Sequence, residues 1–156
     1  MLHIKNIIEE GKELNVIRDL FREYEKELDE DICFQSFEEE LKAPLKKYGP
    51  PDGDLFLATW RDEAAGCIAL TKLKETGACE IKRLYVRPPF REQKIGKMLI
   101  EKLIASAKEK GYTRIRLDSL NKLEAAIRLY TNFGFKRIPA YYDNPLNGVV
   151  YMEKDL

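Results

Sequence analysis

The feature that most constrains the fold is the stretch 83–107, in which a strand runs through a basic loop into an amphipathic helix. The apolar strand ends at Val86, where Pro88 and Pro89 stop the hydrogen-bonding ladder because proline has no N–H to donate. From Ile95 the apolar residues fall at positions 95, 98, 99, 100, 103, 104 and 107, the spacing of one helix face. The first N–H groups of such a helix have no intrahelical partner and carry partial positive charge. The stretch therefore predicts an anion site, and phosphate is the usual anion.

The loop before this helix differs from the two common nucleotide-binding loops. The P-loop requires Ser or Thr after Gly-Lys, but Gly96-Lys97 is followed by Met98, so the hydroxyl that binds magnesium is missing. The dinucleotide-binding pattern Gly-x-Gly-x-x-Gly is also absent. A protein that binds ATP at this helix is thus a disfavoured alternative. A plain strand–turn–helix with solvated basic residues is the purely structural one.

Length and composition indicate a single globular domain over residues 1–156. The chain is 44% hydrophobic, and no apolar run approaches the roughly 18–20 residues that span a bilayer, so we expect no membrane partner. The N-terminus lacks a signal-peptide pattern, and the three cysteines, Cys33, Cys67 and Cys79, lie far apart. We therefore expect a cytoplasmic protein without a disulfide framework. His3 is the only histidine, which argues against a metal site and against a histidine-based catalytic triad.

The charge distribution restricts the partners. The formal net charge is zero, so the chain as a whole offers no attractive field to nucleic acid, and we expect no nucleic-acid partner. Residues 1–44, however, hold 13 acidic and 6 basic residues. Either this part forms solvated helix surfaces, or it faces a cationic acceptor while the basic remainder holds a polyanionic cofactor.

Hydrophobic periodicity and turn signals predict the element order β-α-α-β-β-β-α-β-α-β-β. Short turns make three consecutive strands antiparallel, whereas the strand–helix–strand unit after them requires a parallel, right-handed crossover. The expected fold class is α/β (α+β), with a mixed, mostly antiparallel central sheet of about seven strands flanked by about four helices. We expect strands over 3–8, 54–60, 64–73, 78–86, 112–118, 135–138 and 148–152, and helices over 12–29, from 36, from 95 and from 123.

Local signals locate some of the helix ends. Ser36 with Glu39, and Asn121 with Glu124, fit an N-cap with a partner three residues later. Pro44 lies within the second helical pattern, so we expect that helix to kink or end just before it.

A second motif follows some thirty residues after the basic loop, in the sequence from Ala126 to Phe135. Its pattern, Ala-x-x-Leu-Tyr-x-x-x-Gly-Phe, and the preceding loop of the type Arg-x-x-Gly-x-Gly together closely resemble the GCN5-related N-acetyltransferase (GNAT) superfamily. The resemblance is best over residues 54–138. Arg91 and Gly96 match the arginine and the second glycine of the family loop. Lys94 stands where the first glycine usually is, so residue 94 must adopt a conformation open to a residue with a Cβ atom.

The resemblance implies an N-acetyltransferase that uses acetyl-CoA as acyl donor. It implies direct attack, in a ternary complex, by a primary amine of a small-molecule or protein acceptor. In the family, backbone groups at the end of the loop-bearing strand polarise the thioester carbonyl and pair with the pantetheine arm, and the loop holds the pyrophosphate. The cofactor contacts so implied are Leu84, Tyr85, Val86, Arg91, Glu92, Gln93, Lys94, Ile95, Gly96, Lys97, Asn121 and Tyr130.

Two residues carry the implied chemistry. By resemblance, the Tyr130 phenol hydrogen-bonds or protonates the departing thiolate; alternatively it is a tyrosine packed on the core. Glu80 lies six residues before Val86, the spacing of the catalytic base in the histone-acetylating branch of the superfamily. Burial would raise its pKa toward neutrality. Equally, Glu80 pairs with Lys82 or Arg83, or only positions the acceptor, since many relatives use a water chain instead of a base.

The family often has an asparagine seven residues before the catalytic tyrosine, in contact with the cofactor. Here that position is Leu123, and Asn121, two residues upstream, is a candidate for a cofactor contact or for a helix cap.

The acceptor should bind where the parallel and antiparallel parts of the sheet separate, beneath the N-terminal helices and the 139–147 loop. Tyr141, Tyr142, Asp143 and Asn144 of that loop are the candidate acceptor-binding residues, unless its two prolines only make a rigid connection. The sequence leaves open the acceptor, the acyl-chain length and the oligomeric state, for which a homodimer is one option. A non-catalytic acyl-CoA-binding sensor is the alternative function.

Overall fold

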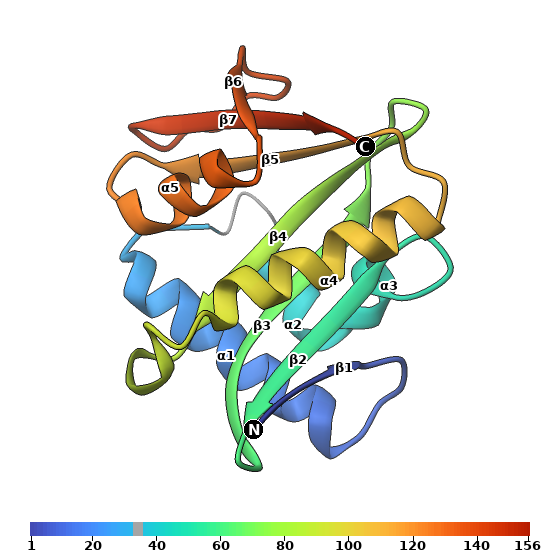
Figure 1. Cartoon of the computed structure of the whole chain (residues 1–156), viewed down its shortest axis with the longest axis vertical. Coiled ribbons are helices and arrows are strands. Elements are labelled where there is room, and N and C mark those ends of the chain that lie inside the picture. The colour runs from blue at the N-terminus through green and yellow to red at the C-terminus, as the bar shows by residue number, and fades with distance from the viewer. Residues whose placement is uncertain (33–35) are drawn as a thin grey trace.

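The fold is built on one mixed sheet, shown in Figure 1 by a computed structural model that describes residues 1–32 and 36–156. Within these residues seven strands lie in the order β1-β2-β3-β4-β5-β7-β6, and β4 with β5 forms the one parallel pair. The strands are β1 (Leu2–Asn6), β2 (Asp54–Trp60), β3 (Glu63–Lys72), β4 (Ala78–Val86), β5 (Arg114–Leu120), β6 (Lys136–Ile138) and β7 (Val149–Asp155). The expected sheet is confirmed, and the element order matches the prediction apart from one additional helix before β2.

Five α-helices flank the sheet in the part of the chain described. They are α1 (Lys12–Leu28), α2 (Phe37–Lys42), α3 (Pro44–Tyr48), α4 (Ile95–Glu109) and α5 (Glu124–Asn132), and a 3-10 turn (Pro88–Phe90) precedes α4. In Figure 1, α4 passes in front of β2, β3 and β4, whereas α1, α2 and α3 lie behind them. Each face therefore has its own apolar core, one with α4 and α5 and the other with α1, α2 and α3. Within the described residues, no helix combines the length and apolar character needed to cross a bilayer.

The expected break near Pro44 is confirmed, and it divides the second predicted helix into α2 and α3. The helix count is therefore five rather than about four, because proline at the first position of α3 cannot donate to the preceding turn.

The predicted N-cap at Asn121 is wrong, and the one at Ser36 is confirmed in position but not in its side-chain hydrogen bond. Ser36 precedes α2, but its side chain makes no capping hydrogen bond and its φ is 59°. The residue that precedes α5 is Leu123, not Asn121. β5 continues to Leu120, and the Asn121 N–H donates to the carbonyl of Gly148 (2.8 Å), which holds Asn121 at the end of β5 against the turn before β7. Sheet pairing therefore overrides the local capping signal.

The two central strands diverge. β4 and β5 pair over Ala78–Glu80 and Arg114–Arg116, after which β5 continues its pairing with β7 alone. β4 bends at a bulge, where its register with β3 shifts and Arg83 adopts a φ of 58°. Among the described residues, the end of β4 consequently has no paired strand on its β5 side, and Figure 1 shows the gap between the strands widening toward α5.

Candidate active site

A cavity lies where β4 and β5 diverge. Its walls are Ile81–Leu84 of β4, Asp118–Leu120 of β5, Tyr130 of α5, and side chains from the C-terminal end of α1. A strand whose backbone N–H and C=O groups have no partner on one side is suited to pair with an extended ligand. A cavity is thus present where the sheet separates, and binding of the acceptor there stays a prediction.

Tyr130 is buried at the wall of this cavity, with 6% of its surface exposed. Its ring packs edge-on against Phe135, with the centroids 5.7 Å apart. Among the described residues, none forms a hydrogen bond with the Tyr130 hydroxyl. Burial, and then the neighbouring Tyr24 and Asp118, raise the pKa of Tyr130 well above its ordinary value. The phenol therefore keeps its proton at neutral pH and has a donor to offer a ligand.

The predicted backbone contacts of β4 are divided between two faces. Leu84 lines the cavity, whereas the Tyr85 ring turns toward α1, where its hydroxyl donates to Glu23 (3.3 Å). Val86 faces the α4 side, and its carbonyl accepts a hydrogen bond from Arg91 Nε (2.9 Å).

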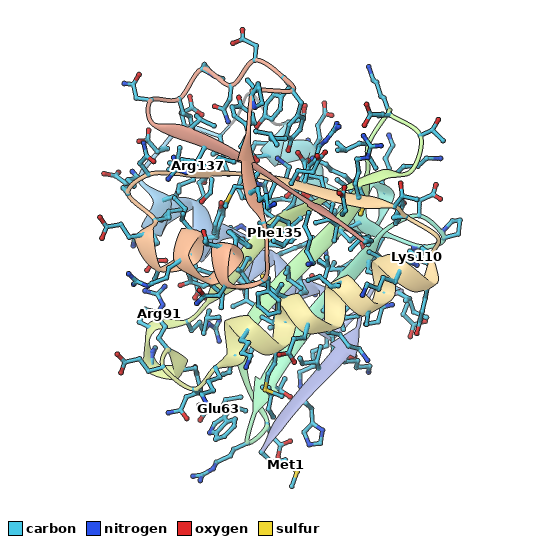
Figure 2. All side chains as sticks on the ribbon, turned by 45° about the horizontal axis from the view of Figure 1, so that its top comes forward. Met1, Glu63, Arg91, Lys110, Phe135 and Arg137 are labelled. Atoms are coloured by element: carbon cyan, nitrogen blue, oxygen red, sulfur yellow. The ribbon has the colours of Figure 1, made fainter. Side chains whose placement is uncertain are left out.

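Arg91 lies in the loop before α4, at the opposite end of that helix from Lys110 (Figure 2). Its guanidinium donates to both carboxylate oxygens of Glu27 on α1, at 2.6 and 2.7 Å. Glu92, Gln93, Lys94 and Lys97 of the same loop and first helical turn are exposed. The basic side chains thus gather around the N-terminus of α4, as the sequence predicted.

The expectation that residue 94 adopts a conformation open to residues with a Cβ atom is wrong. Lys94, the residue that precedes α4, lies in the left-handed region at φ 62° and ψ 20°. A residue other than glycine pays about 1–2 kcal/mol for that conformation. Gly96 has a different role: a Cβ atom there would lie 3.3 Å from Leu129 Cδ2, so glycine lets the first turn of α4 pack closely against α5.

A buried polar cluster occupies the other side of the divergence. Lys82 Nζ lies 3.2 Å from Asp118 Oδ1 and 3.4 Å from Glu80 Oε1. The Tyr141 hydroxyl donates to Glu80 Oε2 (2.5 Å), and the Tyr142 hydroxyl donates to Asp118 Oδ2. The 139–147 loop is therefore fastened to both β4 and β5 through its tyrosines.

The charges in this cluster stabilise one another. Burial disfavours the charged form of Lys82, but the carboxylates of Glu80 and Asp118 outweigh it and raise the pKa of Lys82. Burial likewise opposes ionisation of Asp118, but Lys82 and the hydrogen bonds from Tyr142 and Asn144 lower the pKa of Asp118. Lys82 is thus a cation and Asp118 an anion at neutral pH.

Comparison with known proteins assigns the family. Residues 14–135 match the model of the Acetyltransferase (GNAT) family. The chain belongs to the GNAT family. It is 42% identical to an uncharacterized N-acetyltransferase of Schizosaccharomyces pombe over 148 residues, which is 93% of this chain and 90% of the relative.

Solved structures share the fold of this chain. An acetyltransferase from Streptococcus agalactiae superposes with a TM-score of 0.83 at 22% identity, covering 99% of this chain and 98% of that one. An acetyltransferase from Bacillus subtilis, solved in complex with CoA, superposes with a TM-score of 0.69 at 25% identity, covering 100% and 99% of the two chains.

Not all residues that the sequence singled out lie together in this GNAT fold. Tyr141, Tyr142 and Asn144 gather at the polar cluster, but Asp143 is exposed and contributes no hydrogen bond to it. Asn121 is exposed in the turn against Gly148 and does not line the cavity. Of the alternatives for Glu80, pairing with Lys82 is observed, whereas Arg83 pairs with Glu40.

Sequence reasoning missed Asp118 as a site residue. It is the last polar residue of the alternation Arg114-Ile-Arg116-Leu-Asp118, which places it on the polar face of β5. The alternation can be recognised in the sequence. The bend of β4, which brings Lys82 and the cavity next to Asp118, cannot be.

Proposed function

We propose that this GNAT protein transfers the acetyl group of acetyl-CoA to a primary amine. The observation that carries the proposal is the buried, protonated Tyr130 hydroxyl at the wall of a cavity between two diverging strands. The CoA bound to the Bacillus subtilis acetyltransferase, and acetyl-CoA as the acyl donor of the family, support the choice of cofactor. A cytoplasmic location and a homodimer remain predictions.

The residues present fit acetyl-CoA. The N-terminus of α4, with Arg91, Lys94 and Lys97 around it, suits a pyrophosphate, because unpartnered N–H groups and cationic side chains both favour phosphate oxygens. The pair between Arg91 and Glu27 is exposed, so phosphate can compete with the carboxylate for the guanidinium. The open side of β4 beyond the bulge suits an extended amide-bearing arm.

When bound, acetyl-CoA supplies a thioester with an acetyl carbon open to attack by an uncharged amine. The amine nitrogen forms the new N–C bond, the C–S bond breaks, and the bonding electron pair leaves with sulfur. Tyr130 donates its hydroxyl hydrogen to that sulfur, a role for which its raised pKa keeps the hydrogen in place. The ammonium group of the acceptor must lose one proton before attack, and Glu80 or solvent receives it. The nitrogen loses a second proton as the amide forms, and that proton restores the Tyr130 hydroxyl, directly or through solvent.

The first test is thermal unfolding with acetyl-CoA against ATP and buffer. Ligand at about 100 times its dissociation constant adds roughly 2.7 kcal/mol, which raises the Tm by about 5–10 °C for a domain of this size. A shift with acetyl-CoA and not with ATP is expected. No shift at saturating acetyl-CoA would contradict the proposal.

Tyr130→Phe then separates a transferase from a non-catalytic sensor. We expect it to lower kcat for amine acetylation by about a hundredfold while the Tm shift with acetyl-CoA remains, because only the proton donor is lost. Tyr112→Phe is the matched control, since the Tyr112 hydroxyl donates to the Asp52 carbonyl, away from the cavity. A Tm shift without acetylation of any amine by the unmodified protein would favour the sensor.

A further inference from the structure

The two carboxylates of the buried polar cluster differ in what they face. Asp118 lines the cavity together with Tyr130 and Leu84, where the thioester would lie. Glu80 is one of the three residues through which β4 still pairs with β5, and it does not line the cavity. Asp118 also contributes to the raised pKa of Tyr130, whereas Glu80 does not enter it. Asp118 is therefore the carboxylate nearer the reacting centre.

The Asp118 side chain is held in one orientation from three directions. Its Oδ1 accepts from Lys82 (3.2 Å), and its Oδ2 accepts from Tyr142 and from Asn144 Nδ2 (2.9 Å). Asn144 Nδ2 also donates to the Tyr142 hydroxyl (2.9 Å), so the loop residues brace one another. A carboxylate oxygen accepts more than one hydrogen bond, which leaves Oδ1 able to receive a further N–H.

Three charged side chains line the cavity, the cations of Lys82 and Arg83 and the carboxylate of Asp118, so Asp118 is the one acidic group among the lining residues. Glu80 and Asp118 are partnered by one cation, Lys82, while the guanidinium of Arg83 is already paired with Glu40. The other walls are mostly apolar, formed by Leu28, Ile32, Leu120 and Leu146. Asp118 therefore offers a hydrogen-bond acceptor for one ammonium group, whereas a second charged nitrogen further along the ligand would meet the apolar side chains.

We propose that Asp118 binds the ammonium group of the acceptor and that Glu80 acts behind it as a positioning residue that fixes Lys82. The acceptor class that follows is a primary monoamine on an apolar arm. This inference rests on the proposed transferase activity and deepens it. The lowered pKa of Asp118 agrees with a group that binds a cation and stays ionised throughout, rather than one that removes its proton.

The test compares Asp118→Asn, Glu80→Gln and the control Asp155→Asn, which removes an exposed carboxylate of β7 opposite Arg114, at the other end of β5 from Asp118. The probes are n-hexylamine and 1,6-diaminohexane, assayed by release of the CoA thiol. Asp118→Asn should raise the KM for n-hexylamine by about tenfold to a hundredfold, the loss expected for a hydrogen bond to a charged group. Glu80→Gln should raise it by less than about fivefold, and Asp155→Asn should leave it unchanged. The unmodified protein should prefer the monoamine by about tenfold in kcat/KM.

The outcomes separate this inference from the proposed function. Absence of a Tm shift with acetyl-CoA would overturn the proposed function itself. A normal Tm shift with no acetylation of n-hexylamine, a preference for the diamine, or a larger KM effect in Glu80→Gln than in Asp118→Asn would overturn the role of Asp118. A fall in kcat without a change in KM in Asp118→Asn would overturn it as well. If Asp118→Asn does not fold, Glu80→Gln/Lys82→Met/Asp118→Asn, which removes the cation together with both of its carboxylates, replaces it, and its KM should be at least as high as that expected for Asp118→Asn.

Discussion

Replacement of Glu40 by Gln tests how the bulge of β4 is held. The carboxylate of Glu40 on α2 accepts two hydrogen bonds from the Arg83 guanidinium, at 2.7 and 3.1 Å, and one from the Tyr48 hydroxyl at 2.7 Å. The side chains of Glu40 and Arg83 are each only 2% exposed. The Arg83 guanidinium also lies over the ring of Phe37, with 5.4 Å to the centroid. The pair joins a helix to the residue with positive φ at which β4 leaves β5.

The expected loss of stability is large because Arg83 stays charged after its partner is gone. Burial disfavours the charged guanidinium, but Tyr48 and Glu40 outweigh burial and raise the pKa of Arg83, so the side chain remains a cation in the native protein. Removing one partner of a buried pair costs about 3–5 kcal/mol. For a chain of 156 residues this lowers the Tm by roughly 6–20 °C. Gln has nearly the volume of Glu, so a new cavity does not explain the effect.

Urea unfolding measures the change, with Glu23→Gln as the control. Glu23 pairs with Arg87 at a similar distance, 2.7 Å, but the two side chains are 37% and 29% exposed, so its loss should be only about 0–1 kcal/mol. Glu40→Gln/Arg83→Met removes the stranded charge and should recover more than half of the loss of Glu40→Gln. The reasoning is refuted if Glu40→Gln is as mild as Glu23→Gln, or if the double variant is less stable than Glu40→Gln.

Two further predictions concern the loop and the buried thiols. In the absence of cofactor, Lys94→Gly should raise the free energy of unfolding by about 0.5–1 kcal/mol, because glycine adopts φ 62° without strain. The control Lys97→Gly, inside α4, should lower the free energy of unfolding by about 1 kcal/mol. A change of the same sign in both variants would contradict the argument. Burial, with a smaller contribution from Glu80, raises the pKa of Cys79 to about 12, and burial raises that of Cys67 further still. In a Cys33→Ser variant, native thiol alkylation at neutral pH should therefore be about a thousandfold slower than for a free cysteine, and a rate within tenfold of free cysteine would be inconsistent with burial.

The sequence by itself determined most elements of the fold and the family. Some elements follow from local patterns in the sequence: the helical spacing from Ile95, the short turns between three strands and the break at Pro44. Local sterics and local hydrogen bonding determine these elements directly. The loop at Arg91 and Gly96 and the motif around Tyr130 were sufficient to indicate GNAT, because the order and spacing of both motifs survive in one chain.

Tertiary structure alone decided where the chemistry-bearing side chains meet. Sheet pairing and the turn at Gly148 hold Asn121 away from its predicted cap position, and Lys94, directly before α4, adopts a left-handed conformation. The bend of β4 at Arg83 opened the cavity toward Asp118, a residue 35 positions further along the chain, whereas Glu80 stayed in the paired part of the strand. Such contacts depend on long-range packing and on the pairing of buried charges, and neither can be read from the local sequence pattern.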